Sequence, residues 1–472
     1  MPACLKKIFS GEVPTSSLVA FRILWGLILA LSILRFITKG WVTSLYLEPE
    51  FFFSYWGFSW VKPWNQAWML YTHFGILFLA ALGIATGFYY RLSSLVFFIG
   101  FTMVELWDKS NYLNHYYFIS LMSFLLCWLP LNRAYSLDIA WRKTKAWQTF
   151  PKLVLRSIQF QIGLVYFFAG VAKLGPDWLL QGQPLKIWLS TRTDTPILGF
   201  LFSYPQTALA MSWLGALFDL SVVFFLLWKK TRGLTYLALL FFHLLTYKLF
   251  NIGVFPWVMM VATLVFFDPD WPRRLFSTIL TKIKLQSTGQ KDLIPAKAWM
   301  TENTVMENIR VTKSNDKKLG NYFTLFFCFY FTLQFLFPLR HHFYGGNVLW
   351  HEQGFRFSWR VMLMEKTGVV DFILKDPKTK RQWQVSAKDY LKPHQYRQMV
   401  TQADMILEMA HYLKNLWLAK GFEDIQVYAY SKVSLNGRPN QTLIDPQVNL
   451  AQEKEGLYQK TWIKPWQEAS FF

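Results

Sequence analysis

The sequence predicts a mainly α-helical, polytopic membrane protein: a bundle of about nine spans followed by a C-terminal α+β extramembrane domain. Hydrophobic residues make up 53% of the 472-residue chain and charged residues only 16%, whereas soluble domains carry about 25% charged residues. Several apolar runs reach the roughly 20 residues needed to cross a bilayer. After about residue 339 the composition changes to that of a soluble domain of ordinary size.

Nine apolar segments are expected to cross the membrane. The first, 18–37, has no small-residue cleavage site after it, so we interpret it as a retained span rather than a signal peptide. The aromatic segment 38–66 is expected to lie along the membrane interface. The remaining spans are expected at about 67–89, 93–107, 115–131, 155–174, 208–228, 234–250, 252–267 and 321–338.

The basic residues between these spans predict their orientation. With the N-terminus inside, inner segments hold about 21 Lys and Arg and outer loops about half a dozen, as the positive-inside rule expects. The N-terminus and the loop 268–320 are then cytoplasmic, and an odd span count places the C-terminal domain outside. This asymmetry accounts for the formal charge of +21. We therefore expect no nucleic acid among the partners.

Two domains are expected, a helical bundle over 1–338 that holds the chemistry and an outer-face domain over 339–472 that binds a polypeptide. Strand-like composition in the second domain predicts strands within 359–364, 369–374, 382–386 and 425–430. Apolar residues at helical spacing predict one helix over 393–414.

Common soluble-enzyme motifs are absent from the sequence. It contains no GxGxxG before a helix, no P-loop, no HExxH and no CxxC pair. The three cysteines are too scattered for a zinc site, and the adjacent His341 and His342 cannot face one metal from the same side of a helix. We expect no metal.

Polar residues at the outer ends of spans are the remaining candidates for chemistry. Lys173 ends the apolar run of the fifth span and is followed by Asp177; Asn114 and His115 begin the fourth span, and His243 lies in the seventh. Polar residues in a membrane mark functional sites, although each is also explained by an interhelical hydrogen bond or, for Lys173, by snorkelling to the interface. Burial favours a neutral lysine amine, which is then available as a base.

Five stretches of the sequence resemble one family of membrane enzymes, the vitamin K-dependent gamma-glutamyl carboxylases and their bacterial relatives. They are AGVAKLGPDW (Ala169–Trp178), DKSNYLNHYY (Asp108–Tyr117), LFNIGVFPW (Leu249–Trp257), FFDPDWPRR (Phe266–Arg274) and GFRFSWRVMLMEK (Gly354–Lys366). They occur in the family's order, and the resemblance covers most of the chain.

The resemblance implies a carbon–carbon lyase that oxidises a reduced vitamin K quinol with O2 to its epoxide. The family uses that energy to remove a γ-proton from protein glutamate, and the carbanion takes up CO2 to give gamma-carboxyglutamate. A lysine amine deprotonates the quinol, so that oxygenation creates a strong alkoxide base. Lys173 stands at that lysine's position, with Asn114, His115, His243 and Asp177 as candidate polar partners.

The resemblance also implies co-substrates and partners. We expect a menaquinol-like isoprenoid quinol from the lipid bilayer, with O2 and CO2 and no metal. A glutamate-containing polypeptide would bind the outer domain around Arg356, Ser358 and Trp359. The absence of a cysteine pair beyond Cys328 favours a bacterial inner membrane with a periplasmic C-terminal domain.

Two departures from the family pattern leave alternatives open. Arg133 stands where the animal segment has a histidine, and Phe357 replaces a tyrosine. A quinol epoxidase without carboxylation is therefore one alternative. The other is a non-catalytic membrane receptor for an exported polypeptide, in which Lys173 is only an anchor.

Overall fold

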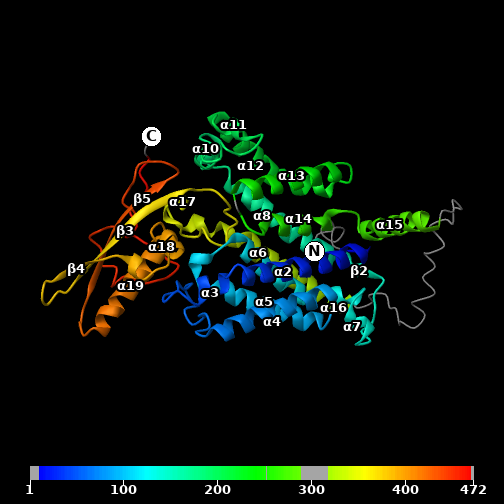
Figure 1. Ribbon diagram of the computed structural model, residues 1–472, viewed down its shortest axis with the longest axis horizontal. Helices are drawn as coiled ribbons and strands as arrows, with labels where there is room; N and C mark the ends of the chain where they lie inside the picture. The colour runs from blue at the N-terminus through cyan, green and yellow to red at the C-terminus, as the bar shows by residue number, and fades with distance from the viewer. Residues whose placement is uncertain (1–9, 251, 289–316, 469–472) are drawn as a thin grey trace.

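A computed structural model describes residues 10–250, 252–288 and 317–468 of the protein. Most of the chain between residues 16 and 343 is helical (Figure 1). The described helices of more than six residues in this part of the chain are α2 (Ser16–Thr38), α4 (Ala67–Thr86), α5 (Tyr90–Trp107), α6 (Asn114–Trp128), α8 (Lys152–Ala172), α12 (Pro205–Leu227), α13 (Arg232–Phe250), α14 (Phe255–Ala262), α15 (Trp271–Thr288), α16 (Lys317–Leu336) and the 3₁₀ helix η5 (Phe337–Phe343).

Short helices fill the connections between these elements. They are α3 (Trp41–Tyr46), η1 (Lys109–Asn111), η2 (Leu131–Arg133), α7 (Leu137–Ala140), α9 (Pro176–Leu179), α10 (Leu185–Ser190), α11 (Gly199–Phe202) and η3 (Thr263–Phe266). A two-stranded antiparallel sheet, which the sequence analysis did not foresee, pairs β1 (Glu12–Pro14) with β2 (Thr149–Pro151).

A helix lies at each of the nine expected spans, and the membrane-protein fold class is confirmed. Seven of the described helices are long and apolar enough to cross a bilayer. The other two are shorter: α6 has 15 residues, and α14 with η3 forms the short apolar helix Phe255–Phe266. Most of the loop 268–320, expected on the inner face, lies outside the described residues.

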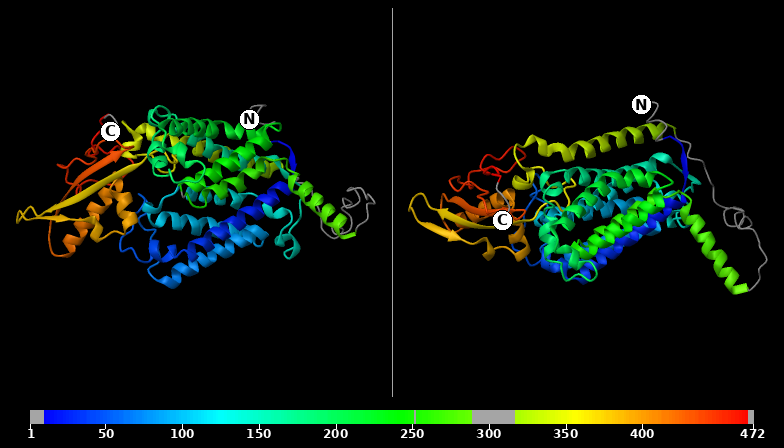
Figure 2. Two further views of the ribbon diagram at one scale, coloured as in Figure 1. Left: turned by 45° about the horizontal axis from the view of Figure 1, so that its top comes forward. Right: turned by 90° about the horizontal axis from the view of Figure 1, so that it is seen from above.

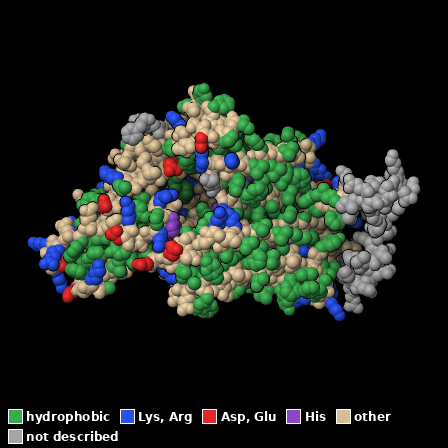
Figure 3. Space-filling model, in the orientation of Figure 1, with side chains coloured by type: hydrophobic (Ala, Val, Ile, Leu, Met, Phe, Trp, Pro, Cys, Tyr) green, Lys and Arg blue, Asp and Glu red, His purple; other side chains and the backbone are tan. Residues whose placement is uncertain are grey.

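The surface of the bundle fits an apolar solvent. Figure 3 shows hydrophobic side chains covering the helical part of this face, whereas charged side chains gather over the C-terminal region. Helix α15 projects from the end of the bundle remote from the C-terminal sheet (Figure 2). Apolar side chains such as Leu31, Leu79 and Leu234 are more than 60% exposed, as expected where lipid replaces water.

One buried cation inside the bundle has a purely structural explanation. Arg22 lies in the second turn of α2 and is 1% exposed. Its guanidinium donates to the carbonyl oxygens of Leu131, Ala134 and Tyr135 at 2.9, 3.0 and 2.6 Å. These carbonyls follow the end of α6, so Arg22 satisfies backbone groups that would otherwise be unpaired in an apolar environment.

The C-terminal region is a three-stranded antiparallel sheet covered by helices. Its strand order is β4-β3-β5. The elements are α17 (Val348–His351), β3 (Lys366–Lys375), β4 (Gln382–Val385), η6 (Ala387–Asp389), α18 (Pro393–Met399), α19 (Ala403–Ala419) and β5 (Gln426–Leu435). Buried side chains of α19 and of the sheet form one apolar core.

The sequence predictions for this region were only partly right. Three of the four expected strands are present, and the expected helix 393–414 is two helices, α18 and α19. The strand expected at 359–364 was wrong, because no β-strand is assigned there. Trp359 and Met362 have φ angles of 58° and 54°, which a strand does not tolerate.

Candidate functional site

Lys173 lies immediately after the last residue of α8, where the sequence stops the helix. Its backbone N–H donates to the carbonyl of Gly170 at the C-cap. Gly175 and Pro176 follow, and Pro176 is the first residue of α9, a position where proline is favoured. The short helix α9 turns Trp178 back, so that its ring lies 5.3 Å from Lys173 Nζ. The Trp178 indole donates to the carbonyl of Ser212 at 2.6 Å.

A glycine brings the partner of Lys173 into reach. A Cβ at Gly170 would meet Leu220 Cγ at 2.7 Å, so α8 and α12 can approach this closely only because Gly170 has no side chain. Asp219, next to Leu220, then accepts a 2.7 Å hydrogen bond from Lys173 Nζ. Both residues are buried, with 6% and 5% exposure. Lys173 is therefore buried and paired with a carboxylate, and its amine does not extend to the membrane interface.

The sequence analysis did not identify Asp219, although a signal was present. Asp219 is the only charged residue in the 23-residue helix α12. A carboxylate within an apolar span is costly unless it has a partner or a function. That rule, applied to α12, would have identified Asp219 as a partner for a cation on a neighbouring helix.

His243 belongs to the same site. Its Nε2 forms a 2.8 Å hydrogen bond with the hydroxyl of Tyr166, and its buried Nδ1 has no partner among the described residues. Tyr166, Ala169 and Lys173 follow one another at helical spacing and share one face of α8. This face and α13 therefore present an amine, a phenol and an imidazole toward common space.

That space is an apolar cavity of about 770 Å³, its open mouth included. Lys173, Asp219, Tyr166, His243 and Thr246 supply the polar part of its lining. The apolar part includes Met211, Phe242, Phe250, Phe255, Met259 and the ring of Trp178. Apolar walls with a few convergent polar groups are typical of sites for small organic molecules.

The remaining predicted partners of Lys173 lie outside the lining of this cavity. The ring of His115 contacts Phe255, which contacts His243 on its other side, with centroids 5.7 and 6.1 Å apart. Asn114 donates to the carbonyl of Arg360 at 3.2 Å. Asp177 accepts from Asn436 and Arg438 in the C-terminal region at 2.7 and 2.8 Å. His115 is thus one ring away from the cavity, and Asn114 and Asp177 connect the bundle to the C-terminal region.

The stretch 354–364 closes one side of the cavity and contains Arg356, Ser358 and Trp359, which were expected to bind substrate. Val361 and Met362 are its members in the cavity lining. Trp359 is 1% exposed and stacks on Tyr117 at 4.9 Å. Ser358 donates to the carbonyl of Gly354 at 2.7 Å and accepts from Arg340 at 3.0 Å. Ser358 and Trp359 therefore hold the shape of this stretch, and residues two to three positions later reach the cavity.

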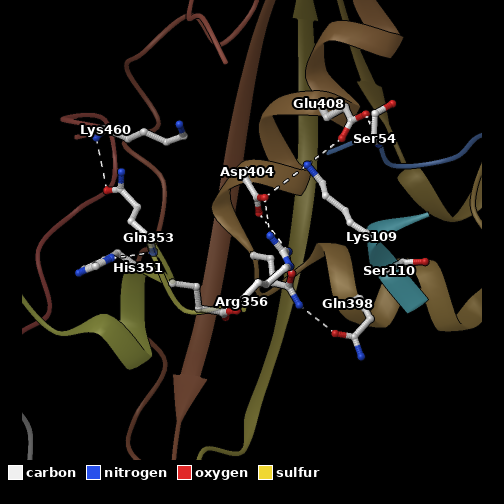
Figure 4. A network of polar contacts seen from close by, with 12 residues as sticks. Ser54, Lys109, Ser110, His351, Gln353, Arg356, Gln398, Asp404, Glu408 and Lys460 are labelled. Atoms are coloured by element: carbon white, nitrogen blue, oxygen red, sulfur yellow. Dashed lines mark hydrogen bonds and ion pairs between the residues drawn. The ribbon is translucent and has the colours of Figure 1, made fainter. Parts of the chain in front are cut away.

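Arg356 is committed to an ion cluster at the junction with the C-terminal region. The interface cluster consists of Lys109, Arg356, Asp404 and Glu408 (Figure 4). Arg356 pairs with Asp404 at 2.7 Å, and Lys109 pairs with Asp404 and Glu408 at 3.3 and 2.9 Å. Burial alone raises the pKa of Asp404, but Arg356 and Lys109 outweigh it and hold that pKa well below its usual range. Two cations face two carboxylates, so Arg356 is already neutralised.

Arg133, the departure from the family pattern, lies away from the cavity lining. Its guanidinium donates to the carbonyl of Lys145 at 3.4 Å and lies 5.8 Å from the ring of Trp147. Within the described ranges, no group of three or more His, Cys, Asp or Glu side chains is placed to hold a metal ion.

Comparison with known families divides the chain into two parts. Residues 11–271 match a family model of the HTTM domain. Residues 319–469 match a model described as the vitamin K-dependent gamma-carboxylase, lumenal domain. No solved structure matches the chain. The first match includes Lys173, Asp219 and His243, and the second includes Arg356 and the stretch that closes the cavity.

Proposed function

This chain belongs to the gamma-glutamyl carboxylase family, as a protein with an HTTM domain and a vitamin K-dependent gamma-carboxylase lumenal domain, and we propose that it couples quinol oxygenation to carboxylation of protein glutamate. The observation that carries the proposal is the Lys173–Asp219 pair at the wall of an apolar cavity. The chain is a carboxylase-like integral membrane protein, and seven helices among its described residues are long and apolar enough to cross a bilayer.

The cavity residues fit an isoprenoid quinol. Phe242, Phe250 and Phe255 offer apolar contact to a ring and tail, while Lys173 and the unpaired Nδ1 of His243 offer hydrogen-bonding partners to its hydroxyl groups. The reduced quinol, with O2, supplies the strong base that protein side chains lack. CO2 is the second small co-substrate, and a menaquinol-like compound of a bacterial inner membrane is the donor we propose.

Lys173 is the proposed base for the quinol hydroxyl. Asp219 holds Nζ at 2.7 Å, so it fixes the position of the amine and accepts its extra proton. The neutral amine then takes the proton of the quinol hydroxyl. Trp178, over the amine, and the apolar lining keep water away, which strengthens the electrostatic interactions in the cavity. Tyr166 fixes the ring of His243 by its 2.8 Å hydrogen bond.

The C-terminal region is proposed to present the glutamate of a polypeptide, on the periplasmic side of the membrane. The supporting observation is that Val361 and Met362 extend from this region into the cavity lining. Since Arg356 is already paired with Asp404, we propose that it shapes the region and does not contact the substrate carboxylate.

The test measures both products of the reaction separately. Purified protein receives reduced vitamin K, O2, labelled bicarbonate and a glutamate-rich peptide, and epoxide and fixed label are followed. Lys173→Ala is compared with Lys186→Ala, an exposed lysine 13 residues later. We expect both products from the wild type and from Lys186→Ala, and neither from Lys173→Ala.

Each other outcome favours one alternative. Epoxide without label, with several glutamate-rich peptides, indicates an epoxidase without carboxylation. Neither product from folded wild-type protein contradicts the proposal and favours the non-catalytic receptor. Equal activity in wild type and Lys173→Ala excludes Lys173 as the base.

A further inference from the structure

A second, basic cavity lies at the bundle end that holds Lys173, and nothing described so far uses it. It measures about 1340 Å³ with its open mouth included. Four cations line it: Arg35 in the last turn of α2, Lys248 in the last turn of α13, and Lys39 and Arg192 in connecting segments. Asp194 is the one carboxylate among the described residues of its lining. We call this cavity the basic basin.

The cations of the basin are not neutralised within the part of the chain that the structure describes. None of the four is among the ion pairs found there, whereas Lys109, Lys173, Lys366 and Arg438 all pair with carboxylates. The guanidinium of Arg35 lies 4.6 Å from the ring of Trp41, which orients it without cancelling its charge. A concave surface with four cations and one carboxylate attracts an anion.

An apolar crevice continues from the basin into the bundle. It is narrow, with about 30 Å³ open to water, and its lining includes Leu29, Ile33, Phe97, Phe101 and Ile119 of α2, α5 and α6. Arg35 and Trp41 line both spaces. The crevice is too narrow for a lipid chain, so a ligand of the basin has its apolar part outside the bundle.

The position of the basin is that of a lipid head group. Helices α2 and α13 both qualify as membrane spans, and the basin lies where both end. Tyr247 in its lining contacts Trp257 at 5.7 Å, and both rings are more than 40% exposed. Exposed aromatic side chains at span ends mark the level of the membrane interface. Phosphate groups of lipids lie at this level, and clustered Lys and Arg side chains attract them electrostatically.

We propose that the basic basin binds one anionic phospholipid, with the phosphate among Arg35, Lys39, Arg192 and Lys248 and the acyl chains in the surrounding bilayer. The basin and the candidate active-site cavity share a wall at the end of α13. Thr246, Phe250 and Ile252 line the candidate active-site cavity, and Tyr247, Lys248 and Gly253 line the basin. The bound lipid therefore braces the end of α13 that closes the candidate active site.

Native mass spectrometry tests the proposal on the full chain. Protein is extracted from vesicles of equal parts phosphatidylglycerol and phosphatidylcholine. The variant Lys39→Gln/Arg192→Gln removes two cations of the basin, and the control Lys229→Gln/Lys230→Gln removes two exposed cations that follow α12, outside the basin lining. We expect one retained phosphatidylglycerol in the wild type and the control, and a preference lower by about tenfold or more in the basin variant.

Three results would overturn the proposal. The first is equal retention of both lipids by the wild type. The second is an unchanged preference in the basin variant, which would place the retained lipid elsewhere. The third is that inorganic phosphate or a glutamate-rich peptide displaces the lipid from the wild type at concentrations that do not change lipid retention by the basin variant. The basin would then bind a soluble anion and not a lipid.

Discussion

Lys109 and Lys173 are both buried lysines, yet their surroundings give them different roles. Their exposures are 5% and 6%, and each forms an ion pair with a carboxylate from a distant part of the chain. Lys109 has two carboxylates and lies at the junction between the bundle and the C-terminal region. Lys173 has one, and it borders an apolar cavity large enough for an organic molecule.

This difference supports the proposed role of Lys173 as a base. Burial and pairing are common to both residues, and burying an ion pair is in general close to neutral for stability. Of the two, Lys173 is the one that lines a cavity described above. The comparison therefore predicts that Lys173 is dispensable for folding and needed for catalysis. Lys109 is predicted to be needed for folding and dispensable for catalysis.

The largest expected effect is on activity when the Lys173 pair is removed as a unit. Replacing Lys173→Met together with Asp219→Leu leaves no unpaired charge in the bundle. We expect epoxide formation to fall by about 10²- to 10⁴-fold, the usual contribution of a positioned base, with the free energy of unfolding changed by about 1 kcal/mol or less. Activity within threefold of the wild type in the folded double variant would refute the assignment.

The next effect is on stability when Lys109 is removed. Lys109→Met leaves Glu408 without its cation in a buried position, and we expect a loss of about 3–5 kcal/mol. Faster proteolysis of the C-terminal region and earlier hydrogen exchange in α19 would show it. Lys378→Met, which removes an exposed ion pair with Glu423, is the control and should cost about 1 kcal/mol or less.

A smaller effect is expected in the pH dependence of stability, and it arises from Asp108 at the junction with the C-terminal region. Burial raises the pKa of the Asp108 carboxyl from 3.8 to about 6, against hydrogen bonds from Ser110 and Gln395. Between pH 3.8 and pH 6, Asp108 is therefore protonated in the folded state but ionised in the unfolded state. The stability that this proton contributes is fully present below pH 3.8 and is lost as the pH rises through 6.

Asp108→Asn should remove this dependence. Relative to the variant, the wild type should lose up to about 3 kcal/mol in the free energy of unfolding between pH 4 and pH 7. Thermal unfolding of both proteins across this range measures the difference. Parallel pH curves for the two proteins would show that Asp108 does not carry the proton.

The smallest effect concerns Asp177, which lies beside the cavity motif in sequence but joins the C-terminal region in space. Asp177→Asn keeps an acceptor for Asn436 and removes the charge paired with Arg438. We expect a loss of about 1–2 kcal/mol in stability and no change in epoxide formation per folded molecule. A large loss of activity at unchanged stability would return Asp177 to the catalytic group.

Most of the bundle could be predicted from the sequence, because the apolar length of a span is a strong physical constraint. Lys173 and His243 could be identified because a polar group in a span needs a reason. Asp219 met the same rule and was overlooked in a helix that the motifs did not include. The strand expected at 359–364 failed because its shape depends on contacts of Trp359 and Ser358 with distant residues, which local composition does not encode.

Gly170 suggests a criterion for judging whether other members of this family can be active. Helices α8 and α12 lie too close together for a methyl group at Gly170. The distance between the Lys173 amine and the Asp219 carboxylate therefore depends on the absence of a Cβ atom at this position. A homologue could keep lysine, aspartate, tyrosine and histidine at every matching place and still be inactive if an alanine stood at the glycine. A comparison of site residues alone would classify such a homologue as an enzyme. The larger distance between its two helices would show that the lysine and the aspartate no longer pair.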